Sequence, residues 1–267
     1  MVAFKNAMEI FSALDKSNCR KCGEKTCLAF AGAVYCGTRK LHECPHLDQS
    51  KLPVTHPGDS GLKRPEENQE EYINQLKSQF AGSDFAEVAK RVGGRVIDDI
   101  LVLKVLGKRF GVRADLSFAT DLHTTPWLVV PLLEYLIHCK GRPVTGEWIP
   151  FREIPGGWEK YALFKKRGED SLKKLADQYT DFFDDIVHMF DGKEVEKQFA
   201  SDVSVVLQPL PLVPMMICYW KPDDGLDSTL NIFFDRSVEA NLGLDPLYSL
   251  AQGIIQMFEK LALHHGF

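Results

Sequence analysis

Residues 18–31 read NCRKCGEKTCLAFA, and a more distant cysteine, Cys44, is followed directly by Pro45. Five of the seven cysteines lie between Cys19 and Cys44, whereas the other two are isolated among apolar residues. An odd number of cysteines with such tight spacing is not typical of a disulfide framework. Thiolates are soft ligands that suit iron–sulfur clusters and zinc, so this stretch predicts a metal centre near the N-terminus.

A helix is expected to begin at Cys27, because Thr26 can cap it and the residues as far as Cys36 read as helical. Its N-terminal dipole would point toward a negatively charged cluster, which is favourable. Cys36 lies about two and a half turns further on, at ~3.6 residues per turn, and so faces away from the site at Cys27. We therefore interpret Cys36, like Cys139 and Cys218, as a small buried apolar residue.

The residues from Asn18 to Ala31, together with Cys44, resemble the 4Fe-4S module of the large subunit of the corrinoid iron–sulfur protein. That protein is the gamma subunit of the acetyl-CoA synthase/CO dehydrogenase complex, and similar modules occur in corrinoid-reactivating proteins. In this family the module is a low-potential one-electron carrier, which implies the same role here. The resemblance covers about the first fifth of the chain and implies that the cluster ligands are Cys19, Cys22, Cys27 and Cys44.

A structural zinc ion is the alternative to the cluster. Zinc also binds four cysteines, but its usual signature is two short C-x-x-C pairs, and the second pair is missing here. Residues 1–47 contain seven Lys and Arg against four Asp and Glu, a net charge of +3 that leaves −8 for the remainder. A cationic module offsets the charge of a cluster, which helps to set its potential. We therefore favour the cluster.

Three parts are expected along the chain: a 4Fe-4S module over residues 1–47, a linker rich in proline and glycine over 48–65, and a larger domain over 66–267. The helical and strand-like segments do not alternate as β-α-β units, so the predicted fold class is α+β with antiparallel strands. The expected helices cover Phe4–Ser17, Glu66–Val92, Pro126–Cys139, Trp158–Lys166, Ser171–Phe190 and Pro246–His264. The expected strands cover Val96–Leu106, Phe110–Phe118, Val203–Leu207, Met215–Trp220 and Leu230–Phe234.

The larger part resembles an uncharacterised family of anaerobic bacteria and archaea, whose members often accompany the cysteine module. The resemblance is carried by Arg142–Glu153, Val213–Trp220 and Asn231–Arg236, covers about residues 70–265, and implies no established activity. Tyr219 and Trp220 are interpreted as core or rim residues, although a place in a pocket wall is the alternative.

The segment from Asp121 to Pro126 reads DLHTTP, close to the D-x-H-x-x-G signature of cobalamin-binding domains. In those domains the histidine is the lower cobalt ligand and the aspartate tunes it. Here Pro126 replaces the glycine and the segment follows a predicted hairpin, so the alternative is a polar loop whose threonine caps the next helix. His123 is therefore a corrinoid-ligand hypothesis that draws its only further support from the corrinoid association of the N-terminal module.

Composition excludes several classes of protein. A net charge of −5 argues against a broad nucleic-acid surface, which needs clustered Lys and Arg. The N-terminal residues carry a charge at Lys5 and no long apolar stretch, so no secretory signal is expected. The longest apolar run, Val203–Trp220, contains three prolines and does not read as a membrane span. We expect a cytoplasmic protein that binds no nucleic acid.

The leading hypothesis is an iron–sulfur redox protein that carries single low-potential electrons to a cofactor or a partner protein by outer-sphere transfer. By family analogy, a corrinoid (cobalamin), held by the second domain or by a partner protein, is the predicted acceptor. One alternative is a cofactor-binding or maturation protein whose metal centre is structural. Another is a reductase whose active site lies in the C-terminal domain, but the sequence offers no catalytic residues for it, so whether the chain is an enzyme stays open.

Overall fold

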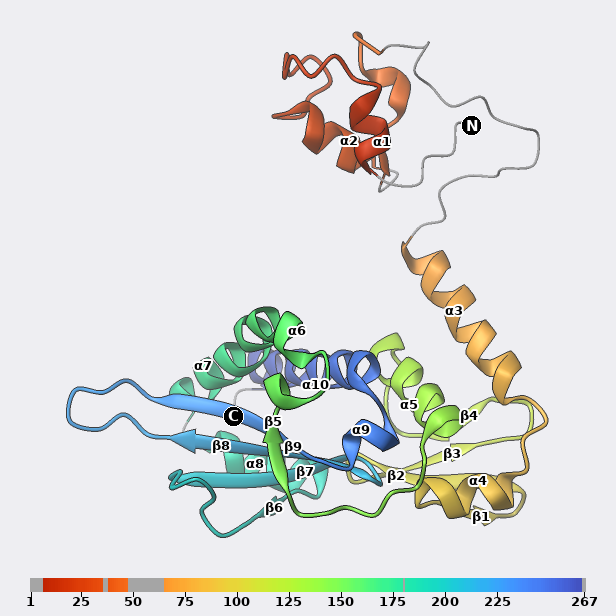
Figure 1. The fold of residues 1–267 in the computed structure, drawn as a ribbon, viewed down its shortest axis with the longest axis vertical. Helices are drawn as coiled ribbons and strands as arrows, with labels where there is room; N and C mark the ends of the chain where they lie inside the picture. The colour runs from red at the N-terminus through yellow and green to blue at the C-terminus, as the bar shows by residue number, and fades with distance from the viewer. Residues whose placement is uncertain (1–6, 36–37, 48–64, 180, 266–267) are drawn as a thin grey trace. The chain divides into compact units, whose positions relative to one another are not determined.

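The computed structural model describes residues 7–35, 38–47, 65–179 and 181–265 (Figure 1). The chain divides into two compact units, Met1–Tyr72 and Ile73–Phe267. The predicted partition at residues 47 and 65 stays a proposal, because residues 48–64 lie outside the described ranges. The first unit contains α1 (Ala7–Ser12), α2 (Cys27–Tyr35), a 3-10 helix (Leu41–Glu43) and the beginning of α3 (Pro65–Phe80).

The first unit is built around a small core between α1 and α2. Its buried side chains are apolar residues and two cysteines: Ile10, Leu14, Cys27, Phe30, Ala31, Val34 and Cys44. Leu14 and Leu47 pair as an isolated antiparallel bridge, which brings the two ends of this region together. The predicted helix over Phe4–Ser17 is too long, since α1 ends at Ser12, and Lys16 then adopts a positive φ of 61° that no helix continues through.

The larger unit contains two antiparallel sheets, which confirms the predicted α+β class. The smaller sheet is a meander in the order β1-β2-β3-β4, and the larger sheet has the order β5-β9-β8-β7-β6. The strands of the meander are β1 (Arg95–Ile97), β2 (Ile100–Val105), β3 (Lys108–Val112) and β4 (Phe118–Thr120). The other strands are β5 (Trp148–Pro150), β6 (Lys193–Glu194), β7 (Val203–Leu210), β8 (Val213–Trp220) and β9 (Thr229–Asp235).

Helices cover one face of the five-stranded sheet, where α6, α7 and α10 are seen in Figure 1. Successive side chains of a strand point to opposite faces. Accordingly Met215, Ile217 and Tyr219 of β8 join the main core under the helices, whereas Met216 and Cys218 belong to a second, small cluster. The helices of this unit are α4 (Phe85–Val92), α5 (Pro126–His138), α6 (Gly157–Phe164), α7 (Asp170–Gln178), α8 (Phe182–Phe190), α9 (Val238–Asn241) and α10 (Leu244–His265).

Two long segments predicted as single helices are each divided in the structure. The segment Glu66–Val92 forms α3 and α4, because Asp84 caps a new helix by accepting a hydrogen bond from the Ala86 N–H at 2.8 Å. Gly93 ends α4 with a φ of 68°, so the helix stops at Val92, the predicted end. The segment Ser171–Phe190 likewise forms α7 and α8. In contrast, α6 continues into α7 through a π-helical turn, Lys165–Glu169.

The predicted strand Val96–Leu106 was also wrong as one element. Asp98 and Asp99 adopt φ values of 50° and 59°, which makes a tight two-residue turn between β1 and β2. The second turn, at Leu106 and Gly107, leads into β3 close to the predicted place. Asp, unlike most residues, tolerates the left-handed region, so two consecutive aspartates were the missed signal.

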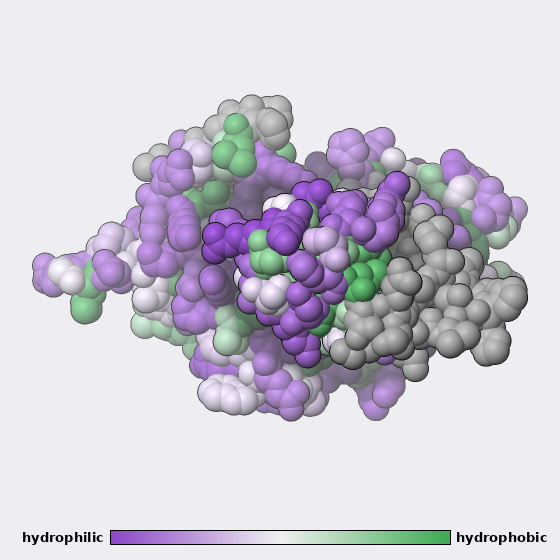
Figure 2. All heavy atoms as spheres, turned by 90° about the horizontal axis from the view of Figure 1, so that it is seen from above, coloured by the Kyte–Doolittle hydropathy of each residue, from purple (hydrophilic) through white to green (hydrophobic). Residues whose placement is uncertain are grey.

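Hydrophilic residues predominate over the face of the molecule drawn in Figure 2, with smaller apolar patches between them. Large apolar side chains that are strongly exposed are scattered over different elements, among them Trp158 of α6 and Leu226 between β8 and β9. No helix in the described part of the chain has the length and apolar character needed to cross a lipid bilayer.

Candidate metal centre

The loop between α1 and α2 carries Cys19 and Cys22 and has an unusual backbone. Lys16, Asn18 and Arg20 all adopt positive φ values, of 61°, 51° and 61°. Left-handed conformations cost an ordinary residue roughly 1–2 kcal/mol, so they persist only where the surrounding structure imposes them. The loop is therefore held in a specific shape, and strained backbone of this kind is concentrated at functional sites.

Asn18 ties the loop to the first turn of α2 by two hydrogen bonds to Cys27. Its side-chain Oδ1 accepts from the Cys27 N–H at 2.7 Å, and its own N–H donates to the Cys27 Sγ at 3.3 Å. Thr26 caps α2 as predicted, since its Oγ1 accepts from the Ala29 N–H at 3.0 Å. An N–H directed at sulfur stabilises a thiolate, which is the form that binds a metal.

Three of the four predicted ligands meet in the small core. Cys27 and Cys44 are buried there, and Cys22 packs against them from a half-buried position. Cys19 is also half-buried but belongs to the loop and not to the core cluster of the described residues. Within the described ranges, no three His, Cys, Asp or Glu side chains lie close enough together to hold a single metal ion. The proposed ligand set thus rests on cysteine spacing, on the shared core and on the hydrogen bonds to sulfur.

Arg39 links the cysteine loop to the segment that carries Cys44. Its guanidinium forms ion pairs with Glu24 at 3.5 Å and with Glu43 at 3.1 Å. It also lies over Gly23, where an added Cβ would come within 2.9 Å of Nη2. Sequence reasoning missed this contact. The sequence does offer a signal for it, because Glu24 follows Cys22, Glu43 precedes Cys44, and the basic Arg39 lies between these two acidic residues.

The charges around the buried cysteines favour a site that is completed by a cation. Burial is the main cause that raises the pKa of the Cys44 thiol, although a hydrogen bond from the His46 N–H opposes it. Hydrogen bonds from Ser17 hold the pKa of the Asp15 carboxyl below its usual value, so a negative charge remains beside Cys27. A buried thiol of this kind becomes a thiolate when metal binding displaces its proton.

These residues fit an iron–sulfur cluster by their donor chemistry. The four cysteines would supply soft ligands, and the N–H of Asn18 donates a hydrogen bond to the Cys27 sulfur, one of the factors that tune the potential of a cluster. The prediction that Cys139 and Cys218 are buried apolar residues is confirmed, since their exposed fractions are 1% and 0%. Cys36 lies outside the described residues, so its assignment stays a prediction.

His123 lies far along the chain, in the segment between β4 and α5. Asp121 and His123 both line a cavity of about 640 Å³, whose walls include Trp127 of α5 and Met257 of α10. His123 itself is exposed, and its carbonyl accepts a hydrogen bond from the Thr125 N–H at 2.9 Å. The structure thus places the motif pair at a mainly apolar cavity. The role of His123 as a cobalt ligand remains a proposal.

Two family models match the chain. Residues 14–46 match the family described as "Putative Fe-S cluster", and residues 84–257, more than half of the chain, match the family described as "Domain of unknown function (DUF3786)". These matches confirm the two resemblances predicted from the sequence. The chain is also similar to the acetyl-CoA decarbonylase/synthase complex subunit gamma of Methanopyrus kandleri, with 40% identity over 47 residues. That alignment covers 18% of this chain and 10% of the relative, and no solved structure matches the chain significantly.

Proposed function

The chain belongs to the DUF3786 family and is an iron–sulfur protein, and from this premise we propose that it transfers single low-potential electrons. The observation that carries the proposal is the cysteine site itself, in which buried Cys27 and Cys44 share a core and Cys27 receives a hydrogen bond from a strained loop. The proposed ligands are Cys19, Cys22, Cys27 and Cys44, and the proposed cofactor is a 4Fe-4S cluster. When bound, such a cluster supplies or accepts one electron at low potential.

The cysteine site has a buried side, at Cys27 and Cys44, and a half-buried side, at Cys19 and Cys22. Burial of Cys27 and Cys44 removes water from one side, and the Asn18 N–H stabilises negative charge on the Cys27 sulfur. Both effects set the potential at which the site accepts an electron. Cys19 and Cys22 lie half-buried on the loop, which makes this side the natural route for an electron to leave.

The exposed loop side is positively charged. Lysines and arginines surround Cys19 and Cys22 at exposed positions: Lys16, Arg20, Lys21 and Lys25. Complementary charge speeds the encounter of two proteins and fixes their orientation. We therefore infer a redox partner that presents an acidic surface to this loop.

The test is to purify the protein under strict anoxia and to measure its iron, acid-labile sulfide and zinc. A 4Fe-4S protein is brown, loses its colour in air, and gives a paramagnetic signal after one-electron reduction. Cys44→Ser should lose iron, whereas Cys139→Ser, a buried cysteine in the other unit, should retain it. Cys36→Ala should retain iron as well.

A colourless protein with one equivalent of zinc would contradict electron transfer and favour the alternative, a binding or maturation protein whose metal centre is structural. Iron retained in full by Cys44→Ser would remove Cys44 from the ligand set.

A corrinoid is the acceptor that the similarity to the gamma subunit supports, held either by a partner protein or at the cavity beside His123. In the second case, protein reconstituted with cobalamin should bind it, and His123→Ala should shift the absorption bands of the bound corrinoid because the lower ligand is lost. An unchanged spectrum would contradict His123 as the ligand, and the matched variant His188→Ala on α8 should leave the spectrum unaltered.

A further inference from the structure

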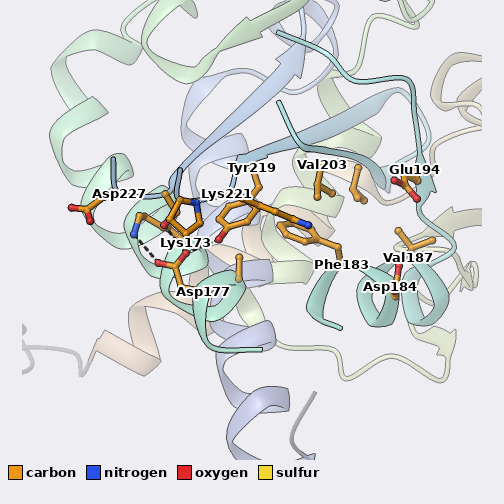
Figure 3. A pocket seen from close by; sticks show the side chains of 14 residues that line it. Lys173, Asp177, Phe183, Asp184, Val187, Glu194, Val203, Tyr219, Lys221 and Asp227 are labelled. Carbon is orange, nitrogen blue, oxygen red and sulfur yellow. Dashed lines mark hydrogen bonds and ion pairs between the residues drawn. The ribbon is translucent and has the colours of Figure 1, made fainter. Parts of the chain in front are cut away.

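A cavity of about 790 Å³ opens in the larger unit where α7 and α8 meet the ends of β7 and β8 (Figure 3). Its volume lies within the roughly 300–1,000 Å³ that is typical of sites for small organic molecules. Neither family match assigns it a ligand, and it is separate from the cavity beside His123. Its walls come from α7, α8, β6, β7, β8 and the segment that follows β8, all in the larger unit, so its shape does not depend on the N-terminal module.

The floor of the cavity is apolar and aromatic. Phe183 of α8 and Tyr219 of β8 form a tilted ring pair with centroids 5.4 Å apart. Val203 and Val205, two residues apart on β7, point to the same face of the sheet as Tyr219 and line the cavity beside it. Flat rings pack well against such a floor, because aromatic pairs add about 0.5–1.5 kcal/mol to the effect of burial alone.

One wall is fixed by a hydrogen-bond network centred on Asp177. Its Oδ1 accepts hydrogen bonds from the Tyr219 hydroxyl at 2.7 Å and the Ser228 hydroxyl at 2.6 Å, and its Oδ2 accepts from Lys173 at 2.7 Å. Tyr219 and Ser228 are only 6% and 5% exposed. The ring of Tyr219 is therefore held in place before any ligand arrives, which lowers the entropy cost of binding.

The charges that remain at the mouth are mainly negative. Since Lys173 is paired with Asp177, the other charged side chains of the lining are the amine of Lys221 and three carboxylates, Asp184, Glu194 and Asp227. Figure 3 shows the Lys221 side chain extended into the cavity, with its amine toward Phe183. The Lys221 amine thus lies at the place where the aromatic floor and the carboxylates together favour a cation.

We propose that this cavity binds a flat organic cation, an aromatic or heteroaromatic ring that carries an amine. The ring lies on Phe183 and Tyr219, and the amine lies near Asp184 and Glu194 in place of the Lys221 amine, which moves out to solvent. The inference goes beyond electron transfer and does not rest on it, because every residue involved belongs to the larger unit.

The test compares three probes with the same ring and different charge, namely tryptamine, indole and indole-3-acetate. Their binding to the full-length protein is measured by calorimetry at neutral pH. We expect tryptamine to bind roughly tenfold more tightly than indole, because it adds a cation–π contact and carboxylate pairing, and indole-3-acetate to bind most weakly. Equal or tighter binding of indole-3-acetate, or no saturable binding of tryptamine at millimolar concentration, would overturn the proposal.

Variants separate the charge from the ring contact. The double variant Asp184→Asn, Glu194→Gln should reduce the preference for tryptamine over indole severalfold, and Phe183→Leu should weaken both. Lys221→Ala, at an exposed position, should tighten tryptamine binding because it removes the competing amine; weaker binding would contradict the proposal. Glu159→Gln, an exposed carboxylate on α6 outside the cavity, is the matched control and should change nothing.

Discussion

Asn18 shows how a single residue can serve a metal site without being a ligand. Its left-handed backbone lets its own N–H reach the Cys27 sulfur while its side chain accepts from the Cys27 N–H. Asn is among the few residues besides Gly that adopt this conformation readily. The identity of the residue before the first predicted ligand is therefore explained by backbone geometry and hydrogen bonding together.

Substitutions at Asn18 can separate these two contributions. Asn18→Gly removes the side-chain acceptor but keeps the backbone unstrained, and we expect a loss of about 1 kcal/mol in the stability of the module. Asn18→Ala adds left-handed strain and should cost about 1 kcal/mol more. The measurement is chemical denaturation followed by the visible absorbance of the cluster. Equal stability of the two variants would show that the backbone strain plays no part.

The Tyr219 hydroxyl offers a second test at the level of single groups. Burial, and then the hydrogen bond and charge of Asp177, raise the pKa of Tyr219 to about 12. A raised folded-state pKa contributes stability below the ordinary value of 10, and this contribution is lost as the pH rises toward 12.

Asp177→Asn should therefore lower the pKa of Tyr219, although not fully to 10, because burial is unchanged. The measurement is the alkaline titration of tyrosinate absorbance, with Tyr219→Phe subtracted to isolate this group. Removing the carboxylate of Asp177 should also make stability less dependent on pH between about 10 and 12. An unaltered pKa in Asp177→Asn would contradict the network.

Among the secondary-structure elements, local sequence signals explain both the successes and the errors. The predicted start of α2 at Cys27, the start of α5 at Pro126 and the end of α4 at Val92 are confirmed. The expected threonine cap of α5 is wrong, because the Thr125 side chain makes no cap hydrogen bond. The division of the acidic segment into α3 and α4 was missed, although Asp84 is a standard capping residue. The acidic, glutamine-rich composition of the segment favours a helix throughout and does not reveal the break.

The cap at Asp84 leads to a direct prediction. Asp84→Ala removes the acceptor for the Ala86 N–H and should destabilise the larger unit by about 1 kcal/mol, or roughly 2–4 °C in Tm. Asp181→Ala is the matched control, because Asp181 precedes α8 in the same position without a side-chain cap bond. Thermal unfolding followed by circular dichroism should separate the two, and a similar shift in both would refute the capping role.

The π-helical turn between α6 and α7 could not be read from the sequence. It places Gly168 against α10, where an added Cβ would lie 3.0 Å from the Gln252 Nε2. That contact joins residues more than eighty positions apart, and no local pattern encodes it. The same holds for the meeting of Asp177 of α7 with Tyr219 of β8 and with Ser228 of the segment between β8 and β9.

For the whole molecule, the two units differ greatly in how much core they contain. Among the described residues, the buried cluster of the first unit has seven members, two of them cysteines, whereas the second unit contains a large main core and a further small cluster. A core that small rarely supports a fold unless a metal or another cross-link contributes. The four-cysteine spacing predicts a metal centre in this unit, and a bound metal would explain how so short a segment stays folded.

We therefore expect two thermal transitions that respond differently to metal. Removal of iron by a chelator under reducing conditions should abolish or sharply lower the transition of the N-terminal unit, because metal-binding energy is folding energy in such modules. The transition of the larger unit should move by less than 1 °C. Calorimetry of metal-loaded and stripped protein measures both, and a shared shift would mean that the two units unfold together.

The bridge between Leu14 and Leu47 means that the chain enters and leaves the cysteine region at neighbouring points. A segment whose two ends lie side by side can be inserted into a surface turn of an unrelated protein without distorting that turn. This region is therefore suited to transfer into another protein. When residues 14–47 are inserted intact into another protein, they should bind the same metal centre there. The larger domain would then be one of several folds that could carry the same iron–sulfur module.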